Sequence, residues 1–95
     1  AIAAVGCLLK LQDGVISDIA ISIGGVEDVP RRFIECEDVL HGLKYDIEEV
    51  KKQITGPLDQ INYLDDSLVT GSYRQKLLKG LLVRSIEQAA SRANS

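Results

Sequence analysis

The sequence predicts a small α+β domain in which an antiparallel sheet of about three strands packs on three helices. Up to Gly24-Gly25, apolar and polar side chains alternate, which is the period of strands with one buried face. From Ile34 onward, apolar residues recur at the spacing of amphipathic helices. Strands that come first and helices that follow indicate an α+β sandwich rather than alternating α/β units.

Two strand runs flank the dipeptide Asp13-Gly14, which is a strong hairpin signal. The apolar positions of the first run are Ala3, Val5, Cys7, Leu9 and Leu11. Those of the second run are Val15, Ile19, Ile21 and Ile23. Each strand would therefore present one apolar face to the core.

The length of the loop between the two runs decides which side chains meet. A two-residue loop would pair Leu9 with Asp18 and place a carboxylate on the core face. A three-residue loop that ends at Gly14 instead pairs Cys7 with Ile19. Because a slip of one residue turns every side chain to the other face, we expect the three-residue loop, with Gly14 at positive φ.

A short edge strand and a first helix should follow the hairpin. Gly24-Gly25 ends the second strand, and residues 29–33 fit a third strand at the edge of the sheet, because Pro30 cannot donate to a ladder. The helical spacing over 34–43 predicts a short helix that Gly42 stops.

Capping signals predict two further helices. The segment Asp46-Ile47-Glu48-Glu49 is typical of a helix start, and Gly56-Pro57 should end that helix. Residues 57–71 are predicted to be a loop. The last helix should begin at Ser72, which has Gln75 at capping-box spacing. Its apolar stripe comprises Leu77, Leu78, Leu81, Leu82, Ile86 and Ala89.

The composition fits one domain and excludes several classes of function. With a net charge of −3 and 4% aromatic residues among 95, the chain offers little for nucleic acid to bind. No apolar run approaches the roughly 20 residues that span a bilayer. Cys7 and Cys36 match neither a disulfide framework nor a zinc motif, which indicates reduced thiols and a cytoplasmic location. We expect one domain over 1–91, cut from a longer polypeptide, and a frayed tail over 92–95.

No set of residues makes a convincing catalytic, cofactor-binding or metal site. The residues after Gly24-Gly25 are acidic and non-helical, so a turn is favoured over a phosphate-binding loop. Asp59 and Asp65-Asp66 lack the frame of a calcium loop and are interpreted as solvated or capping carboxylates. His41 has no partner nearby in the sequence, and Arg31-Arg32 is interpreted as a charge pair that protects a sheet edge.

The candidate structural and interface residues lie at the turns and at the start of the last helix. They are Gly14, Gly24, Gly25, Ser72, Tyr73 and Arg74. Ser72 is predicted to cap the helix, and Tyr73 to lie on its buried stripe. Arg74 should hydrogen-bond backbone carbonyls of the preceding loop, or the carboxylate of Asp65 or Asp66.

Several short segments, taken in order along the chain, carry a resemblance to a known family. They are Ile2-Ala3-Ala4-Val5, Asp13-Gly14-Val15-Ile16, residues 20–26, Pro30-Arg31, Leu40 with Gly42, Asp65-Asp66, and Ser72-Tyr73-Arg74 with Leu77, Leu81, Leu82 and Arg84. Together they resemble the C-terminal domain of the FAD-binding subunit of molybdenum hydroxylases, the family of aerobic carbon monoxide dehydrogenase and xanthine dehydrogenase. The resemblance covers nearly the whole chain.

This resemblance implies a role inside a larger enzyme. The parent subunit would bind FAD through two upstream domains and pass electrons from molybdopterin and 2Fe-2S partner subunits to NAD or another acceptor. The present domain would be non-catalytic and would pack against the flavin domains and the partner subunits. Some relatives place a flavin-facing Lys where this chain has Ala4, so we assign no cofactor contact and expect the isolated chain to bind no flavin.

Two interpretations from other classes stay open. The chain could be a free-standing interaction or dimerisation module, forming a homodimer, or a small metabolite-binding regulatory domain that uses the Gly24-Gly25 turn. The sequence upstream of Ala1 would separate them, because flavin-contact loops there would favour the flavoprotein subunit.

Overall fold

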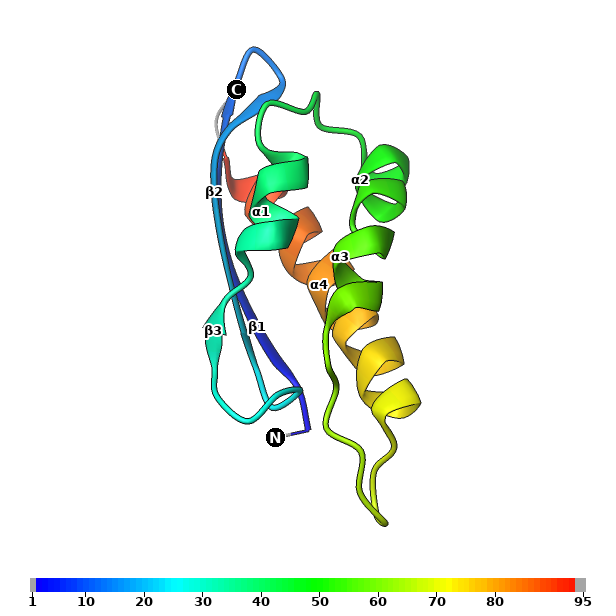
Figure 1. Ribbon diagram of the computed structural model, residues 1–95. Helices are drawn as coiled ribbons and strands as arrows, with labels where there is room; N and C mark the ends of the chain where they lie inside the picture. Colours follow the sequence, from blue (N-terminus) through cyan, green and yellow to red (C-terminus); the bar gives the residue numbers. More distant parts are fainter. Residues whose placement is uncertain (1, 94–95) are drawn as a thin grey trace.

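The computed structural model describes residues 2–93 and arranges them in two layers (Figure 1). One layer is an antiparallel sheet in the order β1-β2-β3, and the helical segments all lie on one side of it. The strands are β1 Ala4–Gln12, β2 Val15–Gly24 and β3 Arg31–Arg32. The helices are α1 Ile34–Leu40, α2 Ile47–Gln53, α3 Thr55–Gln60 and α4 Gly71–Arg92. The predicted α+β class is confirmed.

The hairpin between β1 and β2 turns over two residues. Asp13 and Gly14 have φ values of 54° and 79°, and Gln12 pairs directly with Val15. Positive φ at both central positions defines the type I′ turn that Asp-Gly favours, because its twist matches that of the strands. The predicted three-residue loop is therefore wrong, whereas the positive φ at Gly14 is confirmed.

A β-bulge reconciles the two-residue turn with the apolar pattern. Ser17 is an extra residue in β2, so the register shifts by one and Leu9 pairs with Ile19 rather than with Asp18. Cys7 consequently pairs with Ile21, not with Ile19 as predicted. Between the turn and the bulge, the buried and exposed positions of β2 are therefore exchanged relative to the prediction. Ile16 is fully buried, whereas Val15, which was predicted to lie on the apolar face, is only partly buried.

The far edge of β2 is covered at its start by the chain that leaves α1. Gly42, at a φ of 84°, turns the chain back, and its N–H donates to Ile16 O at 2.8 Å. Ile16 N–H in turn donates to Leu43 O at 2.9 Å. The helix ends before Gly42, as predicted, and the residues from Gly42 onward run beside the start of β2.

The second predicted helix is divided in two. Asp46 caps α2 as expected, but the helical path continues beyond Gly56-Pro57, since α3 begins at Thr55, directly after Ile54. Pro57 is tolerated because the first turn of a helix needs no N–H donor there. The predicted 57–71 loop is therefore shorter and covers only residues 61–70.

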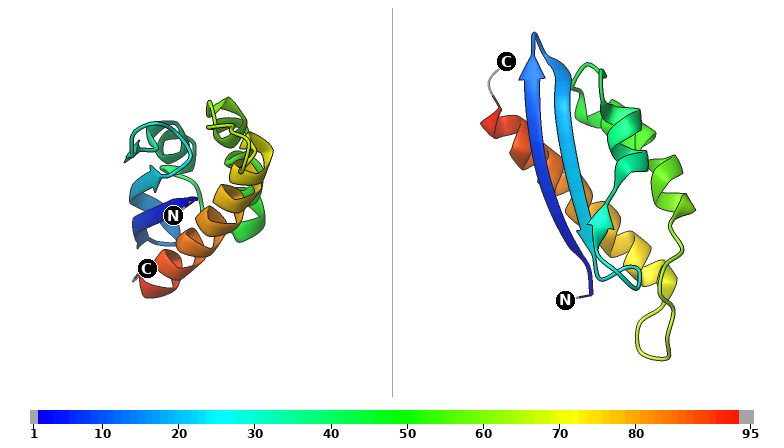
Figure 2. Two further views of the ribbon diagram at one scale, coloured as in Figure 1. Left: turned by 90° about the horizontal axis from the view of Figure 1, so that it is seen from below. Right: turned by 60° about the vertical axis from the view of Figure 1, so that its left-hand side comes forward.

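The core lies between the sheet and the helices. It is formed mainly by fully or nearly fully buried side chains of β2, α1, α2, α3 and α4: Ile16, Ile19, Ile21, Ile23, Val26, Phe33, Cys36, Leu40, Val50, Ile54, Leu58, Ile61, Leu78, Leu82 and Ile86. Figure 2 shows α4 running the length of the sheet, where it covers β1. A frayed tail was predicted over residues 92–95. Arg92 is the last residue of α4 and Ala93 follows it, whereas residues 94–95 lie outside the described residues.

Candidate docking surface

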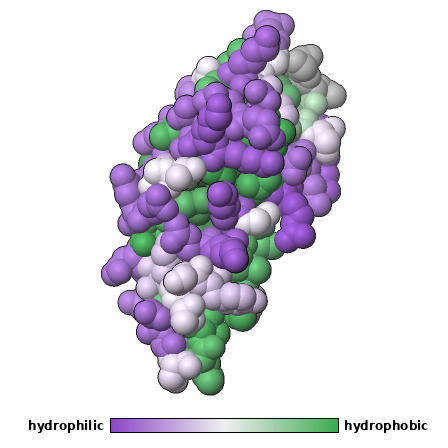
Figure 3. All heavy atoms as spheres, turned by 90° about the vertical axis from the view of Figure 1, so that its right-hand side faces the viewer, coloured by the Kyte–Doolittle hydropathy of each residue, from purple (hydrophilic) through white to green (hydrophobic). Residues whose placement is uncertain are grey.

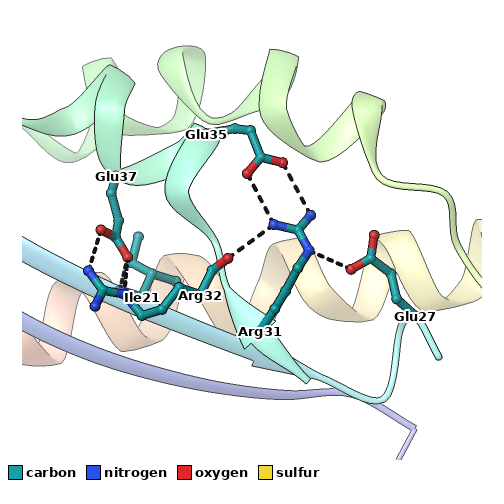
Figure 4. A network of polar contacts seen from close by, with 6 residues as sticks. All are labelled: Ile21, Glu27, Arg31, Arg32, Glu35 and Glu37. Carbon is teal, nitrogen blue, oxygen red and sulfur yellow. Dashed lines mark hydrogen bonds and ion pairs between the residues drawn. The ribbon is translucent and has the colours of Figure 1, made fainter. Parts of the chain in front are cut away.

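Arg31 ties the turn after β2 to the start of α1 (Figure 4). Its Nε donates to Glu27 at 2.6 Å, and its two Nη atoms donate to Glu35 at 3.0 and 3.2 Å. The guanidinium also lies over the ring of buried Phe33, 5.5 Å from its centroid. The interpretation of Arg31-Arg32 as a bare edge-protecting pair was incomplete, because Arg31 also binds two carboxylates of the neighbouring segments.

Glu37 continues the edge of the sheet where β3 ends. Its carboxylate accepts the backbone N–H of Ile21 at 2.9 Å, in the place of a strand carbonyl. Arg32 donates to the same carboxylate twice, each time at 2.6 Å (Figure 4). The Arg32 hydrogen bond, together with that from Ile21, holds the pKa of Glu37 below its ordinary value despite its burial. Sequence reasoning missed this carboxylate entirely.

Arg74 fastens the 61–70 loop to α4. Its Nη1 donates to Leu64 O at 2.7 Å and to Val69 O at 2.9 Å, and its Nη2 donates to Asp66 at 3.2 Å. These are the kinds of contact that were predicted for Arg74. Its side chain is only 9% exposed, so it lies inside the domain rather than at the border of the stripe.

The two residues before Arg74 do not have the predicted roles. Thr70 caps α4, because its hydroxyl accepts Tyr73 N–H at 3.1 Å, and Ser72 lies inside the first turn. The Tyr73 side chain is 52% exposed and points away from the core. The buried stripe lies one residue further along the helix and comprises Arg74, Leu78, Leu82, Ile86, Ala89 and Ala90.

The outer face of the sheet is uncovered and poor in polar side chains at the end where β1 begins. Its paired positions are Ala4 with Gly24, Gly6 with Ser22, and Leu8 with Ala20. Pro30 borders an open hollow over this part of the face. On β1 and β2, charged side chains appear only nearer the hairpin turn, where Lys10 pairs with Asp18. On β3, at the edge of the same face, Arg32 pairs with Ser22, and Glu37 binds its guanidinium. A solvated antiparallel sheet normally carries polar side chains on its outer face, so this pattern is typical of a face that another protein surface covers.

The remaining candidate groups show no reactive arrangement. Burial raises the pKa of Cys7 to about 11 and that of Cys36 to about 12, so both thiols stay protonated near neutral pH. Residues 2–93 contain no cluster of His, Cys, Asp and Glu side chains suited to a metal ion. Within the same residues, no helix has the length and apolar character to cross a membrane.

The fold and this surface define a two-layer α+β domain with one sheet face left open. The family model of the CO dehydrogenase flavoprotein C-terminal domain matches residues 1–89, and the chain belongs to that family.

Named relatives give the comparison its detail. The chain is 32% identical over 90 residues to the glyceraldehyde dehydrogenase medium chain of Sulfolobus acidocaldarius, covering 95% of this chain. It is 30% identical over 91 residues to the nicotine 6-hydroxylase medium subunit of Paenarthrobacter nicotinovorans, covering 96% of this chain. It spans 32% of the length of each of these two relatives. The structure of CO dehydrogenase from Oligotropha carboxidovorans shares the fold, with a TM-score of 0.86, 24% identity, and coverage of 98% of this chain and 32% of that one.

Proposed function

We propose that this chain is the non-catalytic C-terminal domain of the FAD-binding subunit of a molybdenum hydroxylase complex. Its membership of the flavoprotein C-terminal domain family supports this assignment, and so do the medium subunits among its relatives. In that complex, FAD would carry electrons from the molybdopterin and iron–sulfur subunits to an acceptor.

The outer sheet face is the observation that carries the docking role. From Ala4 to Leu8 on β1 and from Ala20 to Gly24 on β2, neither strand places a charged side chain on this face. The charged neighbour from β3, Arg32 beside Ser22, is paired with Glu37. A face of small, mostly apolar residues lets another surface approach the backbone closely. The flavin-bearing domains of the same subunit would cover it.

The residues of this face do not by themselves suit FAD. Ala4, at the position that the family resemblance links to a flavin-facing Lys, is exposed at the start of β1 and offers only a methyl group. None of the face positions among residues 2–93 supplies a stacking ring or a phosphate-binding helix start. The flavin would therefore be held by the other domains, and this chain would contribute packing.

A charge placed on the face tests the proposal in the whole subunit. A Cβ at Gly6 would meet only Ser22 Cβ, at an ordinary 4.0 Å, so Gly6→Glu should leave the melting temperature of the 95-residue chain unchanged. In the FAD-containing subunit it should lower the melting temperature by several degrees, because a carboxylate would be buried against the next domain. Gln12→Glu, on the same face near the turn, is the control. A whole subunit that binds no FAD, or that tolerates Gly6→Glu as well as Gln12→Glu, would contradict the proposal.

A further inference from the structure

The loop of residues 61–70 carries the most exposed large apolar side chain among residues 2–93. Leu68 is 93% exposed, more than Leu8 at 76% or Val29 at 69%. Figure 1 shows the loop projecting beyond the body of the domain, at the end where β1 begins. Figure 3 shows apolar atoms gathered at that tip. Single exposed leucines are common, so the way in which this loop is held carries the argument.

Hydrogen bonds within the loop fix the backbone on both sides of Leu68. The Asp66 carboxylate accepts the N–H of Leu68 at 2.9 Å and that of Val69 at 2.8 Å. Asp66 N–H donates to Val69 O at 3.1 Å, which closes the tip of the loop. The same bonds lower the pKa of Asp66, so its carboxylate stays ionised at neutral pH. Leu68 is therefore presented in one backbone conformation.

Further bonds fasten the base of the loop to the body. Arg74 holds Leu64 and Val69 by their carbonyls, and Leu64 N–H donates to Val26 O at 2.8 Å. Asp65 accepts the N–H of Gly71 at 3.1 Å. Ordering a segment costs conformational entropy. Leu68 itself buries almost nothing in this chain to offset that cost, whereas an apolar side chain on a backbone that is already ordered loses less entropy when it binds elsewhere.

We propose that Leu68 is an anchor that inserts into an apolar pocket with a basic rim, on the domain that precedes this one in the same subunit. This inference rests on the proposed function. The chain spans 32% of each medium subunit that it resembles, and a domain that precedes a C-terminal domain would be joined to it through the residues before β1. The loop lies at the end where β1 begins. Asp65 and Asp66 precede the tip, and Arg74 pairs with only one of these two carboxylates, so a net negative charge remains that a basic rim would complement.

Thiol labelling of the full-length, FAD-containing subunit tests whether the tip is covered. We would compare Leu68→Cys with Lys52→Cys, which lies on the exposed face of α2, using a maleimide at pH 7 and locating the label by peptide mass spectrometry. Cys7 and Cys36 should react little there, since burial raises their pKa to about 11 and about 12. We expect the thiol introduced at position 68 to react about tenfold or more slowly than that at position 52, as in a desolvated anchor pocket. After denaturation both should react equally.

Each other result overturns a defined part of the inference. Equal rates in the native subunit would show that the tip is free and would refute the anchor. Protection that develops only when the molybdopterin or iron–sulfur subunit is added would refute the preceding domain as the occupant. A subunit without FAD would contradict the proposed function instead, and the labelling ratio would still decide whether the loop is covered. As a matched pair, Leu68→Met should keep the melting temperature of the whole subunit, and Leu68→Ser should lower it.

Discussion

Glu37→Ala removes a single carboxylate that serves both the backbone of β2 and the side chain of Arg32. Glu37 is 7% exposed, and its partner Ile21 is fully buried. Without the carboxylate, the Ile21 N–H has no acceptor in the strand arrangement, because β3 ends before it reaches this position. The substitution therefore tests whether a side chain from α1 completes the sheet.

The size of the effect follows from that unpaired donor. Leaving a buried N–H without an acceptor costs roughly 1–3 kcal/mol. The two bonds to Arg32 add little, because that side chain is 54% exposed and solvent screens the pair. With a central loss of about 2 kcal/mol and about 4–8 °C per kcal/mol, we expect the melting temperature to fall by about 8–16 °C.

Thermal unfolding of the 95-residue chain, followed by circular dichroism, measures this loss. Glu35→Ala is the matched control, since it lies in the same turn of α1 but pairs with Arg31 at the surface. An exposed ion pair contributes about 0–1 kcal/mol, so this variant should lose only a few degrees. If the two variants melt at the same temperature, the carboxylate of Glu37 does not complete the sheet.

Acidification gives a second readout of the same group. The pKa of Glu37 in the folded domain lies below its ordinary value of 4.5. Its ionised form therefore stabilises the fold fully above that value, and the contribution is lost as the pH falls through the folded-state pKa. The difference in unfolding free energy between wild type and Glu37→Gln should be largest near neutral pH and should shrink in acid. A difference that stays constant down to the acid range would contradict this linkage.

Three further predictions follow from the described contacts. Arg74→Ala leaves Leu64 O without its donor and removes one of the two donors to Val69 O, at a cost of roughly 1–3 kcal/mol. It should lower the melting temperature by about 4–8 °C per kcal/mol, whereas Arg84→Ala on the exposed face of α4 should not. Gly14→Ala meets no atom within 4 Å but forces a residue with a Cβ to a φ of 79°, so a loss of about 1 kcal/mol should appear in chemical denaturation, and an unchanged midpoint would contradict the type I′ turn. Cys7 and Cys36 should react with iodoacetamide at pH 8 far more slowly in the folded chain than in urea, because their pKa values of about 11 and about 12 leave little thiolate.

The strand pattern was visible in the sequence, but its register was not. Alternation alone located both strands and the Asp-Gly turn. The adjacent polar residues Ser17 and Asp18 break the alternation between Ile16 and Ile19, and that break is the signature of the bulge. If β2 is assumed to have no extra residue, only a three-residue loop keeps the carboxylate of Asp18 off the core face. A local irregularity can thus be mistaken for a different turn.

The start of α4 shows a similar limit. Thr70 and Ser72 are both good capping residues, and the helix has leucines on two adjacent rows, so a shift of the stripe by one residue looks equally apolar. In the structure, the buried row is the one that contains Arg74, Leu78 and Leu82. Arg74 can be buried because its guanidinium donates to two carbonyls and a carboxylate of the 61–70 loop. Such long-range partners leave no periodic signal. The hydrogen bond from Ile21 N–H on β2 to the Glu37 carboxylate was not predicted for the same reason.

The packing of α4 on β1 has a consequence for the order in which the domain can form. β1 pairs with β2, and its inner face is otherwise covered by α4, which follows the other described helices along the chain. The hairpin can close early because its contacts are local, but one side of it stays exposed to water until the C-terminal residues arrive. Nascent chains that end before Leu82 should therefore leave the hairpin amides open to hydrogen exchange, and chains that extend through Arg92 should protect them. In a longer subunit, a domain made earlier would already be present when this one finally closes.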